Sequence, residues 1–288
     1  MNFGRVLTAM VTPFDANGGV DFDKTTNLIE YLIQNGSEGL VVGGTTGESP
    51  TLTSDEKIAL FRHTISKVNR RIPVIAGTGS NNTHASIILT KKAEESGADA
   101  IMLVTPYYNK PSQEGLYQHF SAIASETKLP VMLYNIPGRS VVKMNADTII
   151  RLSKIDNIIA IKEASGDLDL TAGVIEHTSD NFSVYSGEDS NTLPMLSVGA
   201  DGVVSVASHV AGQEIKEMVD AFHSGNTAKA AAIHRKLLPV MNGLFAQPSP
   251  SPVKTALNLK GVDVGGVRLP LIPLTESEQD VLKNLIDN

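Results

Sequence analysis

The sequence predicts an α/β fold, a (β/α)8 TIM barrel with a C-terminal helical appendage. Eight short runs rich in β-branched residues each precede a stretch of helical periodicity, and no linker or second composition pattern interrupts this alternation. The runs end about 28 residues apart on average, close to the ~30 residues of one strand–helix unit. A doubly wound sheet is the alternative, but eight uninterrupted units favour the barrel. The expected strand ends are Val11, Val42, Gly77, Val104, Asn135, Lys162, Ser186 and Ser205.

Capping residues mark the predicted helix boundaries. In three places a glycine follows a helical pattern where a C-cap requires positive φ, and an apolar run starts a few residues later. These glycines are Gly36, Gly97 and Gly199. The expected N-caps are Thr53, whose capping box Glu56 completes, Ser112 and Asn145.

The strand pattern stops at about Gly225. Residues 228–238, 252–259 and 276–285 have helical patterns, and the alternating prolines of residues 248–252 indicate a rigid connection between them. We therefore expect a catalytic barrel over residues 1–225 and a C-terminal helical segment over residues 226–288.

The composition excludes several classes of protein. The chain has 288 residues with 24 Lys+Arg, 31 Asp+Glu, a formal net charge of −7 and no cysteine. The lack of cysteine excludes disulfides, thiolate zinc sites, iron–sulfur clusters and cysteine nucleophiles. The negative charge argues against a nucleic acid or an anionic membrane surface as the main partner. No apolar run approaches the ~18 residues of a membrane span, and the first residues lack a signal-peptide pattern, so we expect a cytoplasmic protein.

Motifs for cofactors, metals and phosphate are incomplete. Residues 77–82 lack the third glycine of a dinucleotide fingerprint, and residues 43–48 lack the Lys-Ser/Thr end of a P-loop. Residues 15–20 begin like a calcium loop but fail at its glycine position, and the seven histidines lack metal-ligand spacing. The carboxylates of Glu188 and Asp189 follow the seventh strand, where they would repel a phosphate. We therefore expect neither a cofactor nor a metal.

A lysine ends the sixth predicted strand, residues 158–163. Because side chains alternate in a strand, Ile159 and Ile161 share one face, and Ala160 and Lys162 share the other. In a barrel the bulky pair would face the helices, which leaves Lys162 inward at the C-terminal mouth. Burial there disfavours the ammonium, and a neutral amine can attack a carbonyl to form a Schiff base. The alternative is a lysine that closes the strand and extends into water.

A tyrosine ends the neighbouring fifth strand at the same height. Adjacent strands lie ~4.8 Å apart, so Tyr134 and Lys162 can meet inside the mouth. Tyrosine hydroxyls transfer protons, which imine formation requires repeatedly. An aromatic plug at the top of the barrel is the alternative for Tyr134 alone.

Two further loops converge on this mouth. Thr45 and Thr46 follow the second strand in a glycine-rich run, whose backbone N–H groups can approach an anion; otherwise they are ordinary turn residues. Arg139 follows the fifth strand and offers a planar fork for a carboxylate, with an exposed loop arginine as the alternative. Tyr107 and Tyr108 follow the fourth strand and could pack, cover the site or form a contact surface.

These motifs together resemble the dihydrodipicolinate synthase family, within the larger group that includes N-acetylneuraminate lyase. The resemblance covers essentially the whole chain. It implies a lyase that condenses pyruvate with L-aspartate 4-semialdehyde, the first committed step toward diaminopimelate and lysine. The motifs are Gly44-Thr45-Thr46-Gly47-Glu48-Ser49, Pro106-Tyr107-Tyr108, Tyr134-Asn135-Ile136-Pro137-Gly138-Arg139 and Ile161-Lys162-Glu163.

The resemblance implies four catalytic residues. Lys162 would form the imine with pyruvate, and Tyr134 would move protons during imine formation and ring closure. Thr45 would link Tyr134 to Tyr108 in a proton relay, with Tyr108 entering the site of a neighbouring subunit. A homo-oligomer, either a dimer or a tetramer, is therefore expected.

The resemblance also implies the substrate-binding residues. Thr46 would bind the pyruvate carboxylate, and Gly187 and Val204 would line the pyruvate pocket with backbone groups. Arg139 would hold the semialdehyde carboxylate. A sibling pyruvate aldolase acting on a sugar acid or N-acetylneuraminate is the alternative, but Arg139 suits a short carboxylated aldehyde better. A non-catalytic acid-binding protein would not need both Lys162 and Tyr134 in the mouth.

One departure concerns regulation. Lysine-inhibited members of the family tend to carry His and Glu side chains at positions where this chain has Ser54, Lys57 and Ala85. We therefore expect feedback inhibition by lysine to be weak or absent.

Overall fold

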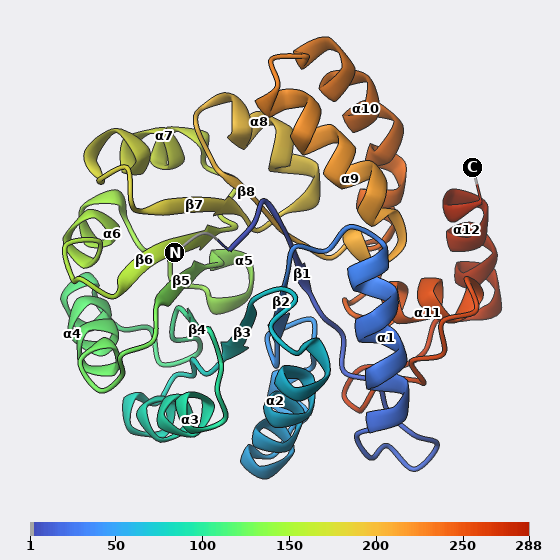
Figure 1. Ribbon diagram of the computed structural model, residues 1–288, viewed down its shortest axis with the longest axis horizontal. Helices are drawn as coiled ribbons and strands as arrows, with labels where there is room; N and C mark the ends of the chain where they lie inside the picture. Colours follow the sequence, from blue (N-terminus) through green and yellow to red (C-terminus); the bar gives the residue numbers. More distant parts are fainter. Residues whose placement is uncertain (1–2, 288) are drawn as a thin grey trace.

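Eight parallel strands close into a barrel in the computed structural model, which describes residues 3–287 (Figure 1). Each strand pairs with the next along the chain, and β8 pairs with β1. The predicted (β/α)8 barrel is confirmed. The strands are β1 (Val6–Ala9), β2 (Gly39–Val42), β3 (Val74–Gly77), β4 (Ala100–Val104), β5 (Val131–Asn135), β6 (Ile158–Glu163), β7 (Ser183–Ser186) and β8 (Gly202–Ser205).

Helices surround the barrel and cover its outer face (Figure 1). The predicted N-caps at Thr53, Ser112 and Asn145 each accept a backbone N–H, and Thr53 forms the capping box with Glu56. No helix within residues 3–287 combines the length and apolar character that a membrane crossing requires. The helices are α1 (Phe22–Gln34), α2 (Ser54–Val68), α3 (Thr83–Glu95), α4 (Gln113–Ala124), α5 (Pro137–Ser140), α6 (Ala146–Leu152), α7 (Leu168–His177), α8 (Thr192–Ser197) and α9 (Ser208–His223), with 3₁₀ turns at Ser49–Thr51 and Asp189–Asn191.

The predicted C-capping glycines have the expected backbone. Gly36, Gly97 and Gly199 have φ of 91°, 89° and 108°, in the left-handed region that glycine adopts without steric cost. Each therefore ends its helix and directs the chain into the next strand.

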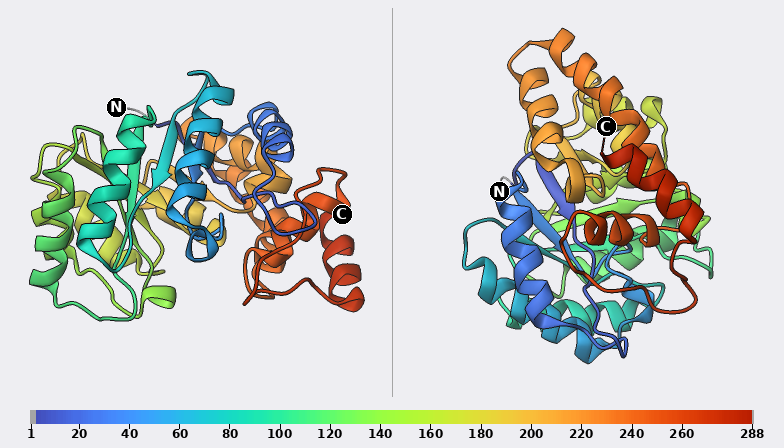
Figure 2. Two further views of the ribbon diagram at one scale, coloured as in Figure 1. Left: turned by 90° about the horizontal axis from the view of Figure 1, so that it is seen from below. Right: turned by 90° about the vertical axis from the view of Figure 1, so that its right-hand side faces the viewer.

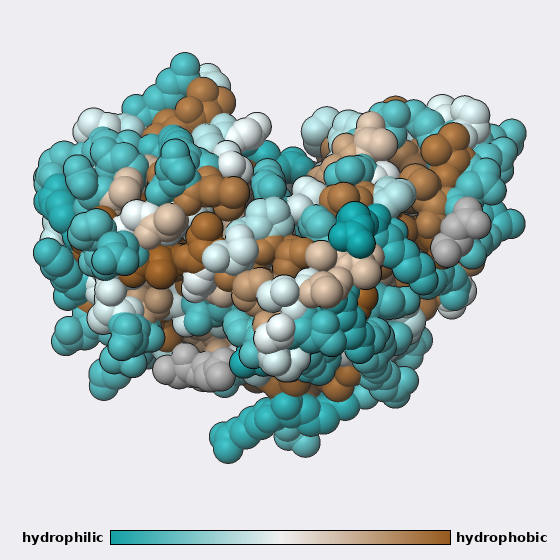
Figure 3. All heavy atoms as spheres, turned by 90° about the horizontal axis from the view of Figure 1, so that it is seen from above, coloured by the Kyte–Doolittle hydropathy of each residue, from teal (hydrophilic) through white to brown (hydrophobic). Residues whose placement is uncertain are grey.

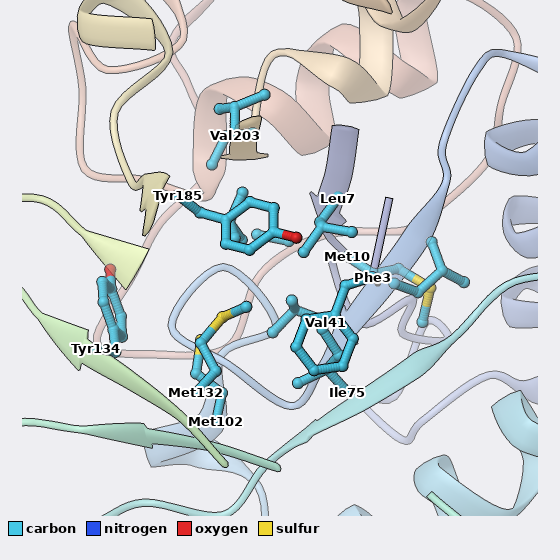
Figure 4. Packing of buried hydrophobic residues seen from close by; sticks show 14 of the residues in the cluster. Phe3, Leu7, Met10, Val41, Ile75, Met102, Met132, Tyr134, Tyr185 and Val203 are labelled. Atoms are coloured by element: carbon cyan, nitrogen blue, oxygen red, sulfur yellow. The ribbon is translucent and has the colours of Figure 1, made fainter. Parts of the chain in front are cut away.

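Apolar side chains from different strands fill the interior of the barrel (Figure 4). The Tyr185 ring lies among them, and its hydroxyl donates to the Gly4 carbonyl at 2.9 Å. This layer closes the lower part of the barrel, so that a cavity can form only at the C-terminal ends of the strands. Its members include Leu7, Val41, Ile75, Met102, Met132 and Tyr185.

The C-terminal segment consists of α10 (Thr227–Gly243), α11 (Ser251–Leu259) and α12 (Glu276–Ile286), as the sequence predicts. It packs on α9, mainly through α10, and lies along one side of the barrel (Figure 2). The predicted end of the first of these helices at residue 238 is wrong, because α10 continues past Pro239. Burial of Met241 and Leu244 in the core offsets the backbone hydrogen bond that proline cannot make.

Candidate active site

Register places Lys162 and Tyr134 side by side. They are paired residues of β6 and β5, and both side chains point to the C-terminal mouth of the barrel. The Nζ of Lys162 lies 4.3 Å from the centroid of the Tyr134 ring. The predicted strand alternation therefore brings the amine and the phenol together in one cavity.

This cavity has a volume of about 480 Å³. A second cavity of about 260 Å³ shares Thr45, Tyr134 and Arg139 with it and extends toward Tyr107. A space-filling view shows one face of the molecule hollowed between two raised parts, with hydrophobic and hydrophilic residues intermixed (Figure 3). Six of the predicted site residues line the larger cavity: Thr45, Thr46, Tyr134, Arg139, Lys162 and Gly187.

The amine of Lys162 is almost fully buried, with 4% of the residue exposed. Burial lowers the pKa of Lys162 to about 8; the Asp189 carboxylate opposes this change, and the Arg139 guanidinium reinforces it. A substantial share of the amine is therefore neutral at or slightly above neutral pH. The alternative of a lysine that extends into water does not fit this burial.

Tyr134 is buried, with 3% of the residue exposed. Burial raises the pKa of Tyr134 to about 12, although the Arg139 charge and a hydrogen bond with the Thr45 side chain act in the opposite direction. The hydroxyl consequently keeps its proton at neutral pH and can donate it to a reacting group. The hydrogen bond places Thr45 next to this proton.

The Thr45–Thr46 loop is a compact turn. Gly43 has a φ of 67°, which allows the chain to reverse after β2. The Glu48 N–H then donates to the Thr45 carbonyl at 3.0 Å, and the Thr12 hydroxyl donates to the Gly47 carbonyl at 2.7 Å. These bonds fix the two threonines at the cavity wall, where Thr46 is 7% exposed.

Asp189 belongs to the cavity wall, a role that could not be predicted from the sequence. Its carboxylate accepts from the Ser205 hydroxyl and from the backbone N–H groups of Val206 and Ala207, at 3.0 and 2.9 Å. These backbone donors follow β8, where barrel enzymes commonly bind phosphate. The Asp189 carboxylate thus occupies the position where a phosphate would bind. From the sequence only its negative charge could be predicted, not these hydrogen bonds.

Arg139 and Tyr108 lie at the rim. Arg139 sits in the short helix α5, which Pro137 begins, and it lines both cavities. Tyr108 is 87% exposed and has a φ of 74°. Val204 is buried in β8, two residues before Val206, which lines the larger cavity; its role in binding stays a prediction.

The C-terminal segment also reaches the cavity, which the sequence did not indicate. Met241 and Asn242 of α10 line its wall, as do Phe245 and Ser249 in the connection to α11. No local pattern marks these residues, since they reach the mouth through the tertiary packing of α10 on α9, on α8 and on the turn at Asp189–Asn191. Within residues 3–287, His, Asp and Glu side chains do not form a group of three or more that could hold a metal ion.

Comparison with known proteins gives matches along the whole chain. A model of the Dihydrodipicolinate synthetase family matches residues 2–288. The 4-hydroxy-tetrahydrodipicolinate synthase of Bacillus subtilis is 63% identical over 287 residues, which cover 99% of this chain and 99% of that protein. A crystal structure of dihydrodipicolinate synthase from Bacillus anthracis has a TM-score of 0.99 at 62% identity and covers 100% of this chain and 99% of that chain. The enzyme from Cyanidioschyzon merolae, crystallised with lysine bound, has a TM-score of 0.97 at 47% identity over 99% and 97% of the two chains.

These matches confirm the predicted resemblance and support its lyase activity over the sugar-acid alternative. They also agree with the fold, because the closed eight-stranded barrel and the C-terminal helices superpose on solved members. The chain belongs to the dihydrodipicolinate synthetase family.

Proposed function

We propose that the chain condenses pyruvate with L-aspartate 4-semialdehyde to 4-hydroxy-tetrahydrodipicolinate through a Schiff base on Lys162. The observation that carries this mechanism is the buried Lys162 amine beside the Tyr134 ring, with a pKa lowered to about 8. About a tenth of such an amine is neutral at pH 7, against roughly three in ten thousand for an unperturbed lysine. Only the neutral form attacks a carbonyl carbon.

The first half of the reaction activates pyruvate. The Lys162 amine adds to the keto carbon, and the resulting carbinolamine loses water to give an iminium. Tyr134 donates the proton that departing water needs, and Thr45, its hydrogen-bond partner, relays protons to it. The iminium withdraws electrons from the pyruvate methyl group, which loses a proton and becomes the nucleophilic carbon of an enamine.

The second half joins the substrates. The enamine carbon forms a carbon–carbon bond with the aldehyde carbon, and the aldehyde oxygen takes up a proton. The amino group of the semialdehyde then attacks the imine carbon, closes the ring and releases the Lys162 amine. One water is lost overall, and the lysine is regenerated without an external oxidant or reductant.

Carboxylate binding positions both substrates. In this proposal Thr46 binds the pyruvate carboxylate through its hydroxyl and backbone N–H, and the backbone of Gly187 and Val204 completes the pocket. Arg139, at the rim of the same cavity, holds the carboxylate of the semialdehyde. Such local groups matter because a net charge of −7 does not attract the carboxylates that both substrates carry.

A second subunit would complete the proton relay. We propose a homo-oligomer, a dimer or a tetramer, in which Tyr108 enters the neighbour's site and meets Thr45. In support, the loop is held by hydrogen bonds from Asn81 Nδ2 to the Tyr107 carbonyl and from Asn109 Nδ2 to the Asn81 carbonyl, at 3.1 and 2.9 Å. The 87% exposed Tyr108 side chain is thereby held outward from a fixed loop. We place this oligomer in the cytoplasm, without a nucleic acid or membrane partner.

Borohydride reduction tests the mechanism. In the presence of pyruvate it should add the mass of a reduced pyruvate imine to Lys162, as peptide mass spectrometry can verify. Lys162→Arg is the control, because it keeps the positive charge but has no amine that forms the imine. A wild-type protein without the adduct would refute the Schiff base.

Turnover distinguishes the substrates. With pyruvate present, the chain should consume aspartate semialdehyde and leave N-acetylmannosamine unchanged. Turnover of the amino sugar instead would favour the sugar-acid aldolase, and an adduct without any turnover would favour a binding protein.

A further inference from the structure

A buried ion pair joins the C-terminal segment to the loop that carries Thr45 and Thr46. Lys254 of α11 is 1% exposed, and Glu48, three residues after Thr45, is 3% exposed. The Lys254 Nζ lies 2.7 Å from Glu48 Oε1. The partners are 206 residues apart in the sequence, so this contact depends on the tertiary fold.

The Lys254 ammonium occupies one fixed position. Besides Glu48, it donates to the Gly266 carbonyl at 2.6 Å and lies 4.0 Å from the centroid of the Phe14 ring. Phe14 follows β1, and its N–H donates to the Val264 carbonyl of the C-terminal segment at 3.1 Å. The ammonium is thus enclosed by groups from three separate parts of the chain.

Glu48 lies at the turn of the loop that carries Thr45 and Thr46, here called the threonine loop. Its φ of 56° lies in the left-handed region, which residues other than glycine rarely adopt unless other contacts hold them there. Its N–H bonds to the Thr45 carbonyl, while its second carboxylate oxygen accepts from the Arg268 N–H at 2.9 Å. A shift of the carboxylate would therefore change the turn in which Thr45 and Thr46 lie.

We propose that Lys254 is a positioning residue for the pyruvate subsite, because it holds Glu48 and thereby fixes the Thr45–Thr46 turn. The inference rests on the proposed function, in which Thr46 binds the pyruvate carboxylate and Thr45 partners Tyr134. A buried ion pair adds little net stability relative to apolar side chains of similar volume, since desolvation offsets the attraction. Its main effect is to hold the two side chains in a single geometry. Here that geometry fixes the turn that carries Thr46, whose hydroxyl and N–H are the proposed donors to the pyruvate carboxylate.

Two variants and one control test this role. Lys254→Met removes the cation but keeps an unbranched side chain. The double variant Glu48→Gln with Lys254→Met removes both charges and leaves no buried carboxylate without a cation. Lys24→Met is the control, because Lys24 joins α1 to the same C-terminal stretch through a 3.0 Å pair with the exposed Asp263.

Steady-state kinetics should vary the two substrates separately. We expect both Lys254 variants to raise KM for pyruvate about tenfold, because a misplaced anion site weakens binding of that substrate. The KM for the semialdehyde should change much less, since Arg139 binds it from α5. Lys24→Met should leave both values close to those of the wild type.

The outcomes separate the hypotheses. If Lys254→Met fails to fold, the double variant alone decides, and a folded double variant with the wild-type KM for pyruvate would overturn the inference. Equal increases in both KM values, or the same increase in Lys24→Met, would also overturn it, because they would indicate a general loosening of the C-terminal segment. A wild-type protein without a pyruvate adduct would instead refute the proposed function.

Discussion

Gly187 lies against the stem of Lys162, so one added methyl group there tests how tightly the lysine must be held. An alanine Cβ at this position would lie 2.6 Å from the Ala164 Cβ and 3.1 Å from the Cγ and Cε atoms of Lys162. The Gly187 backbone does not need the left-handed region, so the effect of Gly187→Ala is purely steric. Something in the cavity wall must therefore move.

The size of the effect follows from these contacts. Over-packing of this kind costs about 1–3 kcal/mol of unfolding free energy, which lowers the Tm of a chain of this size by roughly 2–4 °C per kcal/mol. The Lys162 stem must also shift by a few tenths of an ångström. Because the amine must approach the keto carbon to within ~3–3.5 Å, we expect pyruvate to be trapped about tenfold more slowly.

Timed borohydride trapping, followed by mass spectrometry and combined with thermal unfolding, measures both effects. Gly173→Ala in α7 is the matched control, because its Cβ would meet nothing within 4 Å. Adding Ala164→Gly to Gly187→Ala removes the 2.6 Å contact and should restore part of the trapping rate. A Gly187→Ala variant with wild-type Tm and trapping rate would refute the steric reasoning.

Four further predictions follow from the site and its surroundings. Because the pKa of Lys162 is about 8, trapping in the wild type should accelerate about tenfold per pH unit below pH 8 and level off above it; a flat profile between pH 6 and 8 would contradict this. The Arg139 charge lowers that pKa, so Arg139→Gln should move the rise to higher pH and raise KM for the semialdehyde roughly tenfold or more. Burial lowers the pKa of His209 to about 4, so the folded state stays neutral while the unfolded state gains a proton below about pH 6.5. The free energy of unfolding in urea should therefore fall by about 2 kcal/mol more in the wild type than in His209→Gln between pH 7 and pH 5. Finally, sub-millimolar lysine should barely inhibit the purified enzyme, since Ser54 offers no imidazole or carboxylate; strong inhibition would disprove this.

The strands could be predicted because a buried parallel strand is a short apolar run that ends abruptly. Six of the eight strands end at the predicted residue, and β6 ends one residue later, at Glu163. The prediction for β1 is wrong by two residues, since β1 ends at Ala9. Met10 and Val11 are still buried beyond the end of β1, and the Met10 N–H bonds to the Val41 carbonyl. The apolar pattern in the sequence therefore continues two residues past the strand.

The candidate site was only partly predictable. Lys162 and Tyr134 could be inferred because strand alternation and register are local properties that place both side chains inward at one height. Asp189 could not, because its position depends on hydrogen bonds to the loop after β8. Met241 and Asn242 could not either, since a helix pattern does not state which part of the barrel its end will reach.

The boundary at residues 225 and 226, which we propose from the pattern of strands, separates alternating strands and helices from helices alone, and not two functions. The C-terminal segment supplies part of the cavity wall, and its Lys254 holds Glu48 in the threonine loop. Its Arg268 side chain bonds to Glu56, which completes the capping box of α2, at 3.1 and 2.5 Å, and to the Thr51 carbonyl at 2.7 Å. The Lys254 and Arg268 contacts act on the stretch from Glu48 to the first turn of α2. Because this stretch carries the proposed anion site, the helical segment supports the groups that bind the substrate as well as the fold.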